Sequence, residues 1–481
     1  MRVIQEWQEW QEWQECQSCR AWRGLLCLTL AACGTKAATG GDDGGGPDVP
    51  THQQPGDCGL ANPAFCDTFE HPAPGGRGGD LDEAQWSFGR WGHQVQYLWE
   101  RAPAATYTDD HLFPSTFCGK PFSGVLPDED VKICDGIGVG GEPSLQLNEV
   151  FDDQGDFGIN TMRIRQPFDF ADRTGKVVWD VDGKVNPLNL GHGWWFEMWI
   201  TADPVPLPYH QAPGVTSYPR KGVGFAFQFG ADCPEDTTWW SALETVHVTD
   251  NYQIIHDTPF WELDQAPARC FKVADGKLNR FELRISKDQA ELWASDYDDP
   301  SSLSLRATAP NLGLTFTRGY VHFQHGQYNA PKDGHVTGSQ TFRWDNIGFD
   351  GPTLATPRGY DVGNPGMPGA GGAVRIGWFL DGGPQTFTVH DVDLRRATSA
   401  SFNFTIDGMP NQTLEYAFNG HAAHSFTYPQ TVGEPGGVHG FSLEAPLAEL
   451  VAGDNTIVVR VPSPFTKQGI GNLDLTIEAS P

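Results

Sequence analysis

The side chains best suited to chemistry crowd into one short stretch, GWWFEMWIT, at residues 193–201. If this stretch is a β-strand, successive side chains point to opposite faces. One face is then entirely apolar and is predicted to enter a core: Trp194, Phe196, Met198 and Ile200. The other face places a carboxylate between two indoles: Trp195, Glu197 and Trp199.

An indole–carboxylate–indole face has the chemistry of a carbohydrate platform. Flat aromatic rings stack on the C–H surface of sugar rings, and a carboxylate accepts hydrogen bonds from sugar hydroxyls. We therefore predict that Trp195 and Trp199 form the floor of a sugar site, with Glu197 between them. The alternative is that loops bury both faces of the strand and that Glu197 forms a salt bridge.

Three further alternating stretches offer polar partners for that face: NTMRIRQ, GVGFAFQFG and YVHFQHGQY. In each of them the apolar positions are predicted to face the core, which turns the polar positions outward. If these stretches share one sheet with residues 193–201, they add six side chains to the groove: Arg163, Arg165, Gln228, Tyr320, His322 and Gln324. The arginine pair would favour a carboxylated or sulfated sugar. The alternative for this pair is a solvated outer face.

The elements that must position these side chains are short β-strands. From residue 57 to 351, alternating runs recur between Gly, Pro and Asp, which predicts a large all-β, two-sheet sandwich. Residues 352–373 are rich in Gly and Pro and are predicted to be a linker. Residues 374–481 resume the strand pattern without any Cys, as expected for a smaller β-sandwich or jelly roll.

Three stretches of the larger region resemble the concanavalin A-like lectin/glucanase superfamily: CDTFEHP with DEAQWSFGRW, KLNRFELRISKDQAELWASD, and YNAPKDGHVTGSQTFRWDNIGFDGP. The resemblance implies a curved sandwich whose concave sheet often binds sugar. In the smaller region, ELVAGDNTIVVRV resembles the closing strands of galactose-binding-like modules. A fold alone does not give a function.

Two enzyme classes of the same superfamily can be compared with the sequence. Laminarinase-type hydrolases carry Glu-x-Asp-x-x-Glu on one strand, but here Glu262 and Asp264 are followed by Pro267 where the second Glu would stand. Alginate-lyase-type enzymes use a Gln-Ile-His strand and a Tyr-rich last strand. Here Gln253 and His256 are separated by one residue too many, and the stretch 320–328 is two residues too long. Neither motif fits, so polysaccharide cleavage stays an alternative to sugar binding.

Cysteine usage predicts an oxidising compartment. After a signal segment is removed, six Cys remain besides Cys33, and their closeness favours three disulfides, Cys58–Cys66, Cys118–Cys134 and Cys233–Cys270. No CxxC pair is left for zinc. No cofactor is required, although two acidic loops could supply oxygen ligands for Ca²⁺: Asp152, Asp153 and Asp156, and Asp296, Asp298 and Asp299.

Residues 1–32 are predicted to be a secretory signal that includes, near its start, a Gln-Glu-Trp repeat to which we assign no function. The run LAAC, ending at Cys33, resembles a bacterial lipobox, which implies cleavage before Cys33 and a lipid on its sulfur. Residues 33–56 are then a lipidated, flexible tether. Gly34 and not Asp follows Cys33, which by resemblance to bacterial lipoprotein sorting rules implies the outer membrane of the cell envelope.

The net charge of −29 argues against a nucleic-acid partner, which needs a basic surface. The predicted partners are a polysaccharide or other glycan and, through the lipid anchor, a membrane. The leading hypothesis is a surface-anchored, lectin-like lipoprotein. The alternatives are a polysaccharide hydrolase or uronate lyase of the same fold, and a structural or adhesion lipoprotein that binds a protein partner.

Overall fold

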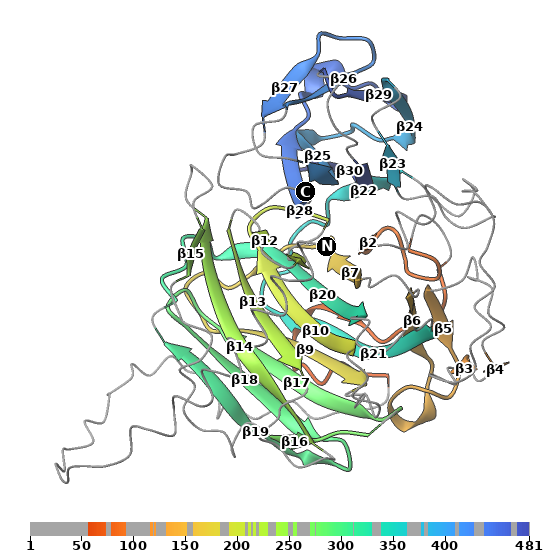
Figure 1. Cartoon of the computed structure of the whole chain (residues 1–481). Helices are drawn as coiled ribbons and strands as arrows, with labels where there is room; N and C mark the ends of the chain where they lie inside the picture. Colours follow the sequence, from red (N-terminus) through yellow and green to blue (C-terminus); the bar gives the residue numbers. More distant parts are fainter. Residues whose placement is uncertain are drawn as a thin grey trace, which may run out of the picture.

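A computed structural model of the chain shows an all-β protein (Figure 1). The described residues are 56–73, 78–92, 116–118, 120–121, 131–151, 157–182, 192–206, 210–212, 215–217, 221–228, 237–248, 254–256, 270–274, 276–310, 312–329, 338–362, 377–379, 383–408, 413–427, 437–462 and 469–480. The predicted signal peptide, Cys33 and nearly all of the predicted tether lie outside them. Within these ranges no helix has the length and hydrophobicity needed to cross a bilayer.

Two large antiparallel sheets form the first sandwich, as the sequence predicts. The sheet that carries the predicted site is called the front sheet, and its strands in spatial order are β15 (Ile254–His256), β14 (Thr237–Val248), β13 (Lys221–Gln228), β10 (His192–Thr201), β20 (Arg318–Asn329), β7 (Phe157–Ile164) and β2 (Trp86–Gly92). Two short strands join it, β16 (Phe271–Lys272) on β14 and β8 (Phe168–Asp169) on β20.

The other sheet of this sandwich is called the back sheet. Its order is β19 (Asp299–Pro310), β18 (Gln289–Asp296), β17 (Leu278–Ile285), β9 (Gly175–Asp182), β21 (Gly338–Asp350), β6 (Ser144–Phe151) and β5 (Val131–Cys134), with β1 (Pro63–Asp67) on β21. Two small hairpins lie outside both sheets, β3 (Thr116–Phe117) with β4 (Lys120–Pro121) and β11 (His210–Ala212) with β12 (Val215–Ser217). A short 3-10 turn, Val139–Gly141, precedes β6.

The core of the first sandwich consists of alternate side chains from both sheets. Met198 and Ile200 of β10 are fully buried in it, which confirms the predicted apolar face for the half of that face whose side chains are described. On the back sheet, Trp179 and Phe281 stack at 5.4 Å, and Trp179 meets Phe323 of the front sheet at 5.5 Å. The opposite face of β10 therefore points away from the core.

The second sandwich has two smaller sheets, and Figure 1 shows it against the outer side of the front sheet. One sheet has the order β22 (Arg358–Asp361), β30 (Gly469–Ala479), β25 (Ala397–Gly408) and β28 (Gly437–Glu444), with β23 (Gly377–Phe379) also on β30. The other has the order β24 (Gln385–Val392), β29 (Gly453–Arg460), β26 (Thr413–Phe418) and β27 (His424–Thr427). A 3-10 turn, Leu447–Glu449, follows β28.

The second sandwich begins earlier than the sequence predicts. Strand β22 lies inside the predicted linker 352–373, yet it pairs with β30, and Val362 enters the core of this sandwich. Pro357 and Gly359 give the segment the composition of a linker. Its partner is the last strand of the chain, and no local sequence pattern reveals so distant a pairing.

Two of the three favoured disulfides are present, Cys58–Cys66 and Cys118–Cys134. Cys270 is also disulfide-bonded, while Cys233 lies outside the described residues. The chain-entropy model gives about 3 kcal/mol of stabilisation for a loop of the size closed by the second bridge. The covalent links therefore fasten the N-terminal part of the first sandwich to its back sheet.

Candidate functional site

Strand register brings the predicted residues together on the outer face of the front sheet, called the polar face below. β10 pairs with β13 and β20, β20 pairs with β7, and β7 pairs with β2. One row across four strands is therefore Trp199, His322, Arg163 and Ser87, and the next is Glu197, Gln324, Thr161 and Gly89. Trp195 and Gln228 are cross-strand partners on the same face, but their side chains are outside the description.

A chain of hydrogen bonds, called the Trp199 network, crosses three strands of the polar face. Trp199 Nε1 donates to Glu197 Oε2 at 2.7 Å, and Gln324 Nε2 donates to the same oxygen at 3.0 Å. Thr161 Oγ1 donates to Gln324 Oε1 at 2.8 Å. The network fixes the orientation of the Gln324 amide and holds the carboxylate beside the indole, so the aromatic and polar parts of the predicted platform are pre-positioned.

Gly224 of β13 allows the Trp199 ring to lie against the sheet. A Cβ atom at this position would stand 2.4 Å from two atoms of the indole, which is closer than non-bonded carbons approach. One ring face therefore rests on the β13 backbone. Trp199 is only 2% exposed, as is Glu197, so these two side chains are closed off from solvent in this structure.

His322 stands next to Trp199 in register and is completely buried. Thr201 Oγ1 donates to the carbonyl of Asp203 at 2.6 Å, which leaves it to accept from His322 Nε2 at 2.7 Å. This arrangement assigns the imidazole proton to Nε2. Burial, with a smaller effect of Arg163, holds the pKa of His322 well below its usual value, so the ring is neutral. The other nitrogen, Nδ1, is buried and has no hydrogen-bond partner among the described residues.

The arginine pair at the other end of the polar face already has carboxylate partners. Arg163 Nη2 and Arg165 Nη1 bind Asp474 Oδ2 of β30 at 2.9 and 3.0 Å, and Arg165 Nη2 binds Asp361 Oδ1 of β22 at 2.9 Å. All four side chains, called the arginine cluster, are at most 2% exposed. The pair is therefore neither a solvated face nor a pair of uncompensated charges, because the second sandwich supplies its counter-ions.

Two more contacts close this end of the face. Ser87 Oγ donates to Asp474 Oδ2 at 2.9 Å, and Tyr320 OH donates to Glu478 Oε1 of β30 at 2.8 Å. Burial lowers the pKa of Arg163, whereas the carboxylates outweigh burial and raise that of Arg165. Both guanidinium groups are charged. Tyr320 thus serves the contact between the sandwiches in addition to lying on the predicted face.

Of the two acidic loops, only the one with Asp296, Asp298 and Asp299 lies in the described residues, and its carboxylates have protein partners. Asp296 accepts the backbone N–H of Lys272 at 2.9 Å, Asp298 pairs with the Lys272 ammonium at 3.3 Å, and Asp299 accepts from Ser301. Across the described ranges no cluster of three His, Cys, Asp or Glu side chains could hold a metal ion. The other proposed loop, Asp152, Asp153 and Asp156, lies outside those ranges.

Four residues that were not among the predicted site residues complete the polar face: Ser87, Thr161, Thr201 and Gly224. Thr161 could have been predicted, because it shares the strand alternation that turns Arg163 outward. Thr201 likewise follows the alternation of residues 193–201. The importance of Gly224 depends on a neighbouring strand, and that of Ser87 depends on the second sandwich.

No protein-family model matches the chain, and no curated protein matches it. Among solved structures, lectin II from Ulex europaeus is similar with 10% identity over 59% of this chain and 99% of the lectin, at a TM-score of 0.28. The winged bean acidic lectin complexed with methyl-α-D-galactose has 8% identity over 59% and 97%, at 0.29. A non-specific endo-β-1,3(4)-glucanase from family GH16 has 11% identity over 62% and 95%, at 0.29. At such identities and TM-scores, the likeness carries no conclusion about this chain.

Proposed function

We propose that the protein is an exported carbohydrate-binding protein and that it binds sugar on the polar face of the front sheet. The observation that carries the proposal is the Trp199 network, which joins an indole to a carboxylate and an amide across neighbouring strands. The buried Nδ1 of His322, which has no hydrogen-bond partner in the described part of the chain, adds an acceptor for a sugar hydroxyl. The network therefore combines stacking with hydroxyl recognition.

The charge distribution on this face favours a neutral sugar. Arg163 and Arg165, which the sequence suggested as partners for a carboxylated or sulfated sugar, are compensated by Asp361 and Asp474. An anionic sugar would have to displace a buried carboxylate from both arginines. A neutral sugar that binds around Trp199 would not have to displace a buried carboxylate from an arginine.

Sugar binding at Trp199 requires an opening step, because the ring is 2% exposed. Association should therefore be slow, near or below the lower end of the usual range of about 10⁵–10⁷ M⁻¹s⁻¹. The observed rate should level off at high sugar concentration when the opening limits binding.

A glycan array probed with the full chain, followed by product analysis of each bound glycan, tests the proposal. Binding of neutral glycans without chemical change is the expected result. New reducing ends would instead identify a hydrolase, and unsaturated uronates would identify a lyase. Absence of binding to every glycan would contradict the proposal and favour a protein-binding adhesion role.

We also propose that Cys33 carries a lipid that anchors the protein to the envelope, with the outer membrane as its site. The disulfides Cys58–Cys66 and Cys118–Cys134 support an oxidising compartment. Metabolic labelling with a fatty-acid probe should tag the native chain and not Cys33→Ala. Equal labelling of both would contradict the anchor and leave the sugar-binding proposal untouched. Deleting residues 2–19, which contain the Gln-Glu-Trp repeat, should leave export intact.

A further inference from the structure

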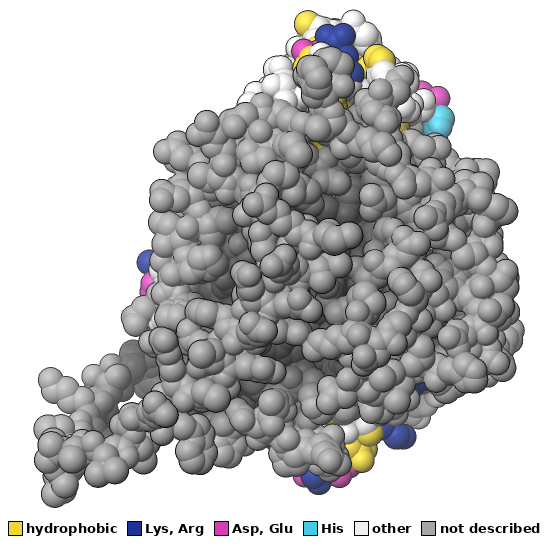
Figure 2. Space-filling model, in the orientation of Figure 1, with side chains coloured by type: hydrophobic (Ala, Val, Ile, Leu, Met, Phe, Trp, Pro, Cys, Tyr) yellow, Lys and Arg dark blue, Asp and Glu magenta, His cyan; other side chains and the backbone are white. Residues whose placement is uncertain are grey.

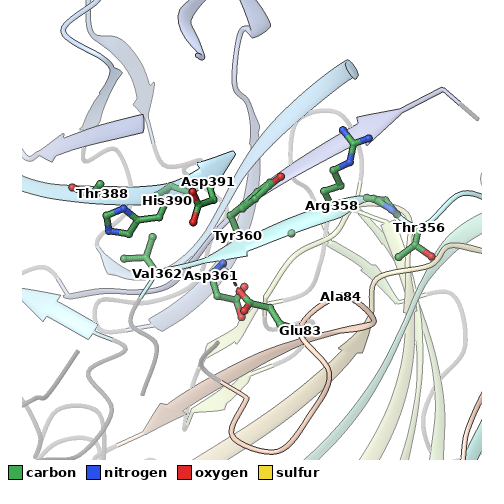
Figure 3. Close-up of a pocket in the computed structure, with 13 residues that line it drawn as sticks. Glu83, Ala84, Thr356, Arg358, Tyr360, Asp361, Val362, Thr388, His390 and Asp391 are labelled. Atoms are coloured by element: carbon green, nitrogen blue, oxygen red, sulfur yellow. Dashed lines mark hydrogen bonds between the residues drawn. The ribbon is translucent and has the colours of Figure 1, made fainter. Parts of the chain in front are cut away.

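A cavity of about 900 Å³, called the inter-sandwich cleft, lies where the two sandwiches meet, away from the Trp199 network. Its lining comes from three segments that are distant in sequence: Glu83–Ala84 before β2, residues 356–362 including β22, and residues 388–391 of β24. Figure 3 shows Glu83 and Asp361 together on one side of the cleft, with Thr388, His390 and Asp391 on another. A volume of this size is in the range of small-molecule sites.

The arginine cluster determines the shape of this cleft. Asp361 lines the cleft and also binds Arg165 of the first sandwich at 2.9 Å, so the position of β22 depends on that buried ion pair. Gly359 lies so close to Arg165 that a Cβ atom there would overlap the guanidinium group. The Asp361 N–H also faces Glu83 Oε1 at 3.4 Å. The cleft is therefore a product of the docked sandwiches and belongs to neither alone.

The walls of the cleft mix donors and acceptors around an aromatic side chain. Glu83, Asp361 and Asp391 line the cleft with carboxylates, and Thr388 lines it with a hydroxyl. Arg358 and His390 also line it and already have protein partners, because Arg358 Nη1 donates to the carbonyls of Asp393 and Arg395 and His390 Nδ1 lies 3.1 Å from Asp454 Oδ1. Tyr360 contributes its ring, and its hydroxyl is held by the Asp393 backbone N–H at 2.7 Å. In the described sheets β22 and β24 are both edge strands, so the cleft is also flanked by strand edges.

This lining excludes several classes of ligand. A polyanion would meet three carboxylates on a protein of net charge −29. A lipid would need a predominantly apolar wall, whereas this lining includes six charged or polar side chains: Glu83, Arg358, Asp361, Thr388, His390 and Asp391. A metal ion is disfavoured because the described residues contain no suitable cluster of ligands. A neutral, polyhydroxylated ligand matches paired donors and acceptors beside an aromatic ring.

We propose that the inter-sandwich cleft is a second binding site for a neutral oligosaccharide, separate from the polar face and contacted by both sandwiches. The ligand class rests on the proposed function, while the location rests on the cleft alone. A glycan chain held at both places would be bound with higher overall affinity than at either, provided that it spans them.

Thr388→Trp tests the cleft because Thr388 is exposed on β24 and lines the cavity, so an indole there would obstruct part of it. Thr386→Trp is the matched control. Thr386 is exposed on the same face of the same strand, two residues earlier, and does not line the cleft. Neither position belongs to the arginine cluster or to the Trp199 network, so folding and sandwich docking should be retained in both variants.

The readout is calorimetric titration of the full chain with a neutral oligosaccharide that binds in the glycan array. We expect Thr388→Trp to weaken one binding event about ten-fold or more and Thr386→Trp to change it less than about two-fold. Equal behaviour of the two variants would overturn the cleft proposal. Loss with Thr388→Trp and none with Trp199→Phe would keep the cleft and reject the polar face. The reverse pattern would keep the polar face and reject the cleft.

Discussion

The same tryptophan–glutamate pair occurs on both sheets of the first sandwich. On β10, Trp199 Nε1 donates to Glu197 Oε2 at 2.7 Å, and on β18, Trp293 Nε1 donates to Glu291 Oε2 at 3.2 Å. In both pairs the two residues are two positions apart and so share one strand face. The pair is thus a local consequence of strand alternation and does not by itself mark a binding site.

The neighbours of the two pairs differ. The Arg284 guanidinium lies over the Trp293 ring at 4.1 Å and is paired with Glu282, so the indole is covered by a cation of its own sheet. The Trp199 ring rests on Gly224, and its carboxylate partner is shared with Gln324. Only the pair on the front sheet combines an indole with uncharged polar groups from adjacent strands. The proposed sugar site therefore rests on the cross-strand neighbours of Trp199 and not on the tryptophan–glutamate pair itself.

The largest expected effect concerns the charged end of the polar face. Arg165→Ala would leave Asp361 and Asp474 short of a buried counter-ion and should lower the free energy of unfolding by about 3–5 kcal/mol. Arg318→Ala is the control, because Arg318 also contacts the second sandwich through Glu478 but is exposed. Its loss should cost at most about 1 kcal/mol in urea unfolding. Equal costs for the two variants would contradict the assigned role of the arginine cluster.

The second-largest effect on stability is expected at the core residues next to each tryptophan. Met198→Ala, adjacent to Trp199, and Leu292→Ala, adjacent to Trp293, should each cost about 2–5 kcal/mol, because both side chains are fully buried in one core. Glycan affinity of the folded fraction should stay unchanged in both variants. A loss of affinity in Met198→Ala without a loss of stability would show that β10 is assigned to the wrong face.

A smaller effect, on the pH dependence of stability, is expected from Asp345 of β21 on the back sheet. Burial raises its pKa to about 8, although backbone N–H groups of Val139 and Asn346 act in the opposite direction. Since an unfolded Asp titrates near pH 4, the folded state holds the extra proton between these values. Stability should therefore fall as pH rises from about 4 to 8, by at most about 1.4 kcal/mol per unit from this group.

Asp345→Asn removes this titration while preserving the shape of the side chain. Urea unfolding measured at several pH values should show a flatter dependence for the variant than for the native chain. Identical slopes would contradict the raised pKa. Sugar binding should not depend on the substitution, because Asp345 lies on the back sheet.

Much of the fold follows from alternation in the sequence. The period of two placed Met198 and Ile200 in the core and turned Glu197 and Trp199 away from it, as the structure has them. Alternation did not predict strand β22, because the strand is short, lies among Pro and Gly residues, and pairs with β30 near the end of the chain.

The candidate site was less accessible to sequence reasoning. Alternation indicated that Arg163 and Arg165 leave the core, but their partners Asp361 and Asp474 lie about two hundred and three hundred residues away along the chain. The pattern of ELWAS at Glu291–Trp293 equals that of residues 197–199 in type and spacing, yet only the structure shows Arg284 over the second ring. Charge compensation and coverage of a ring are properties of the folded chain.

Calorimetric comparison of Trp199→Phe with Trp293→Phe tests the central claim most directly. Each substitution removes an indole N–H donated to a glutamate two residues earlier, so the local chemical change is the same. A sugar stacked on Trp199 should lose about ten-fold in affinity, or about 1.4 kcal/mol, when the ring shrinks. Trp293→Phe should leave the affinity within about two-fold of the native value. Equal affinities for the native chain and Trp199→Phe, or a larger loss with Trp293→Phe, would contradict sugar binding on the polar face.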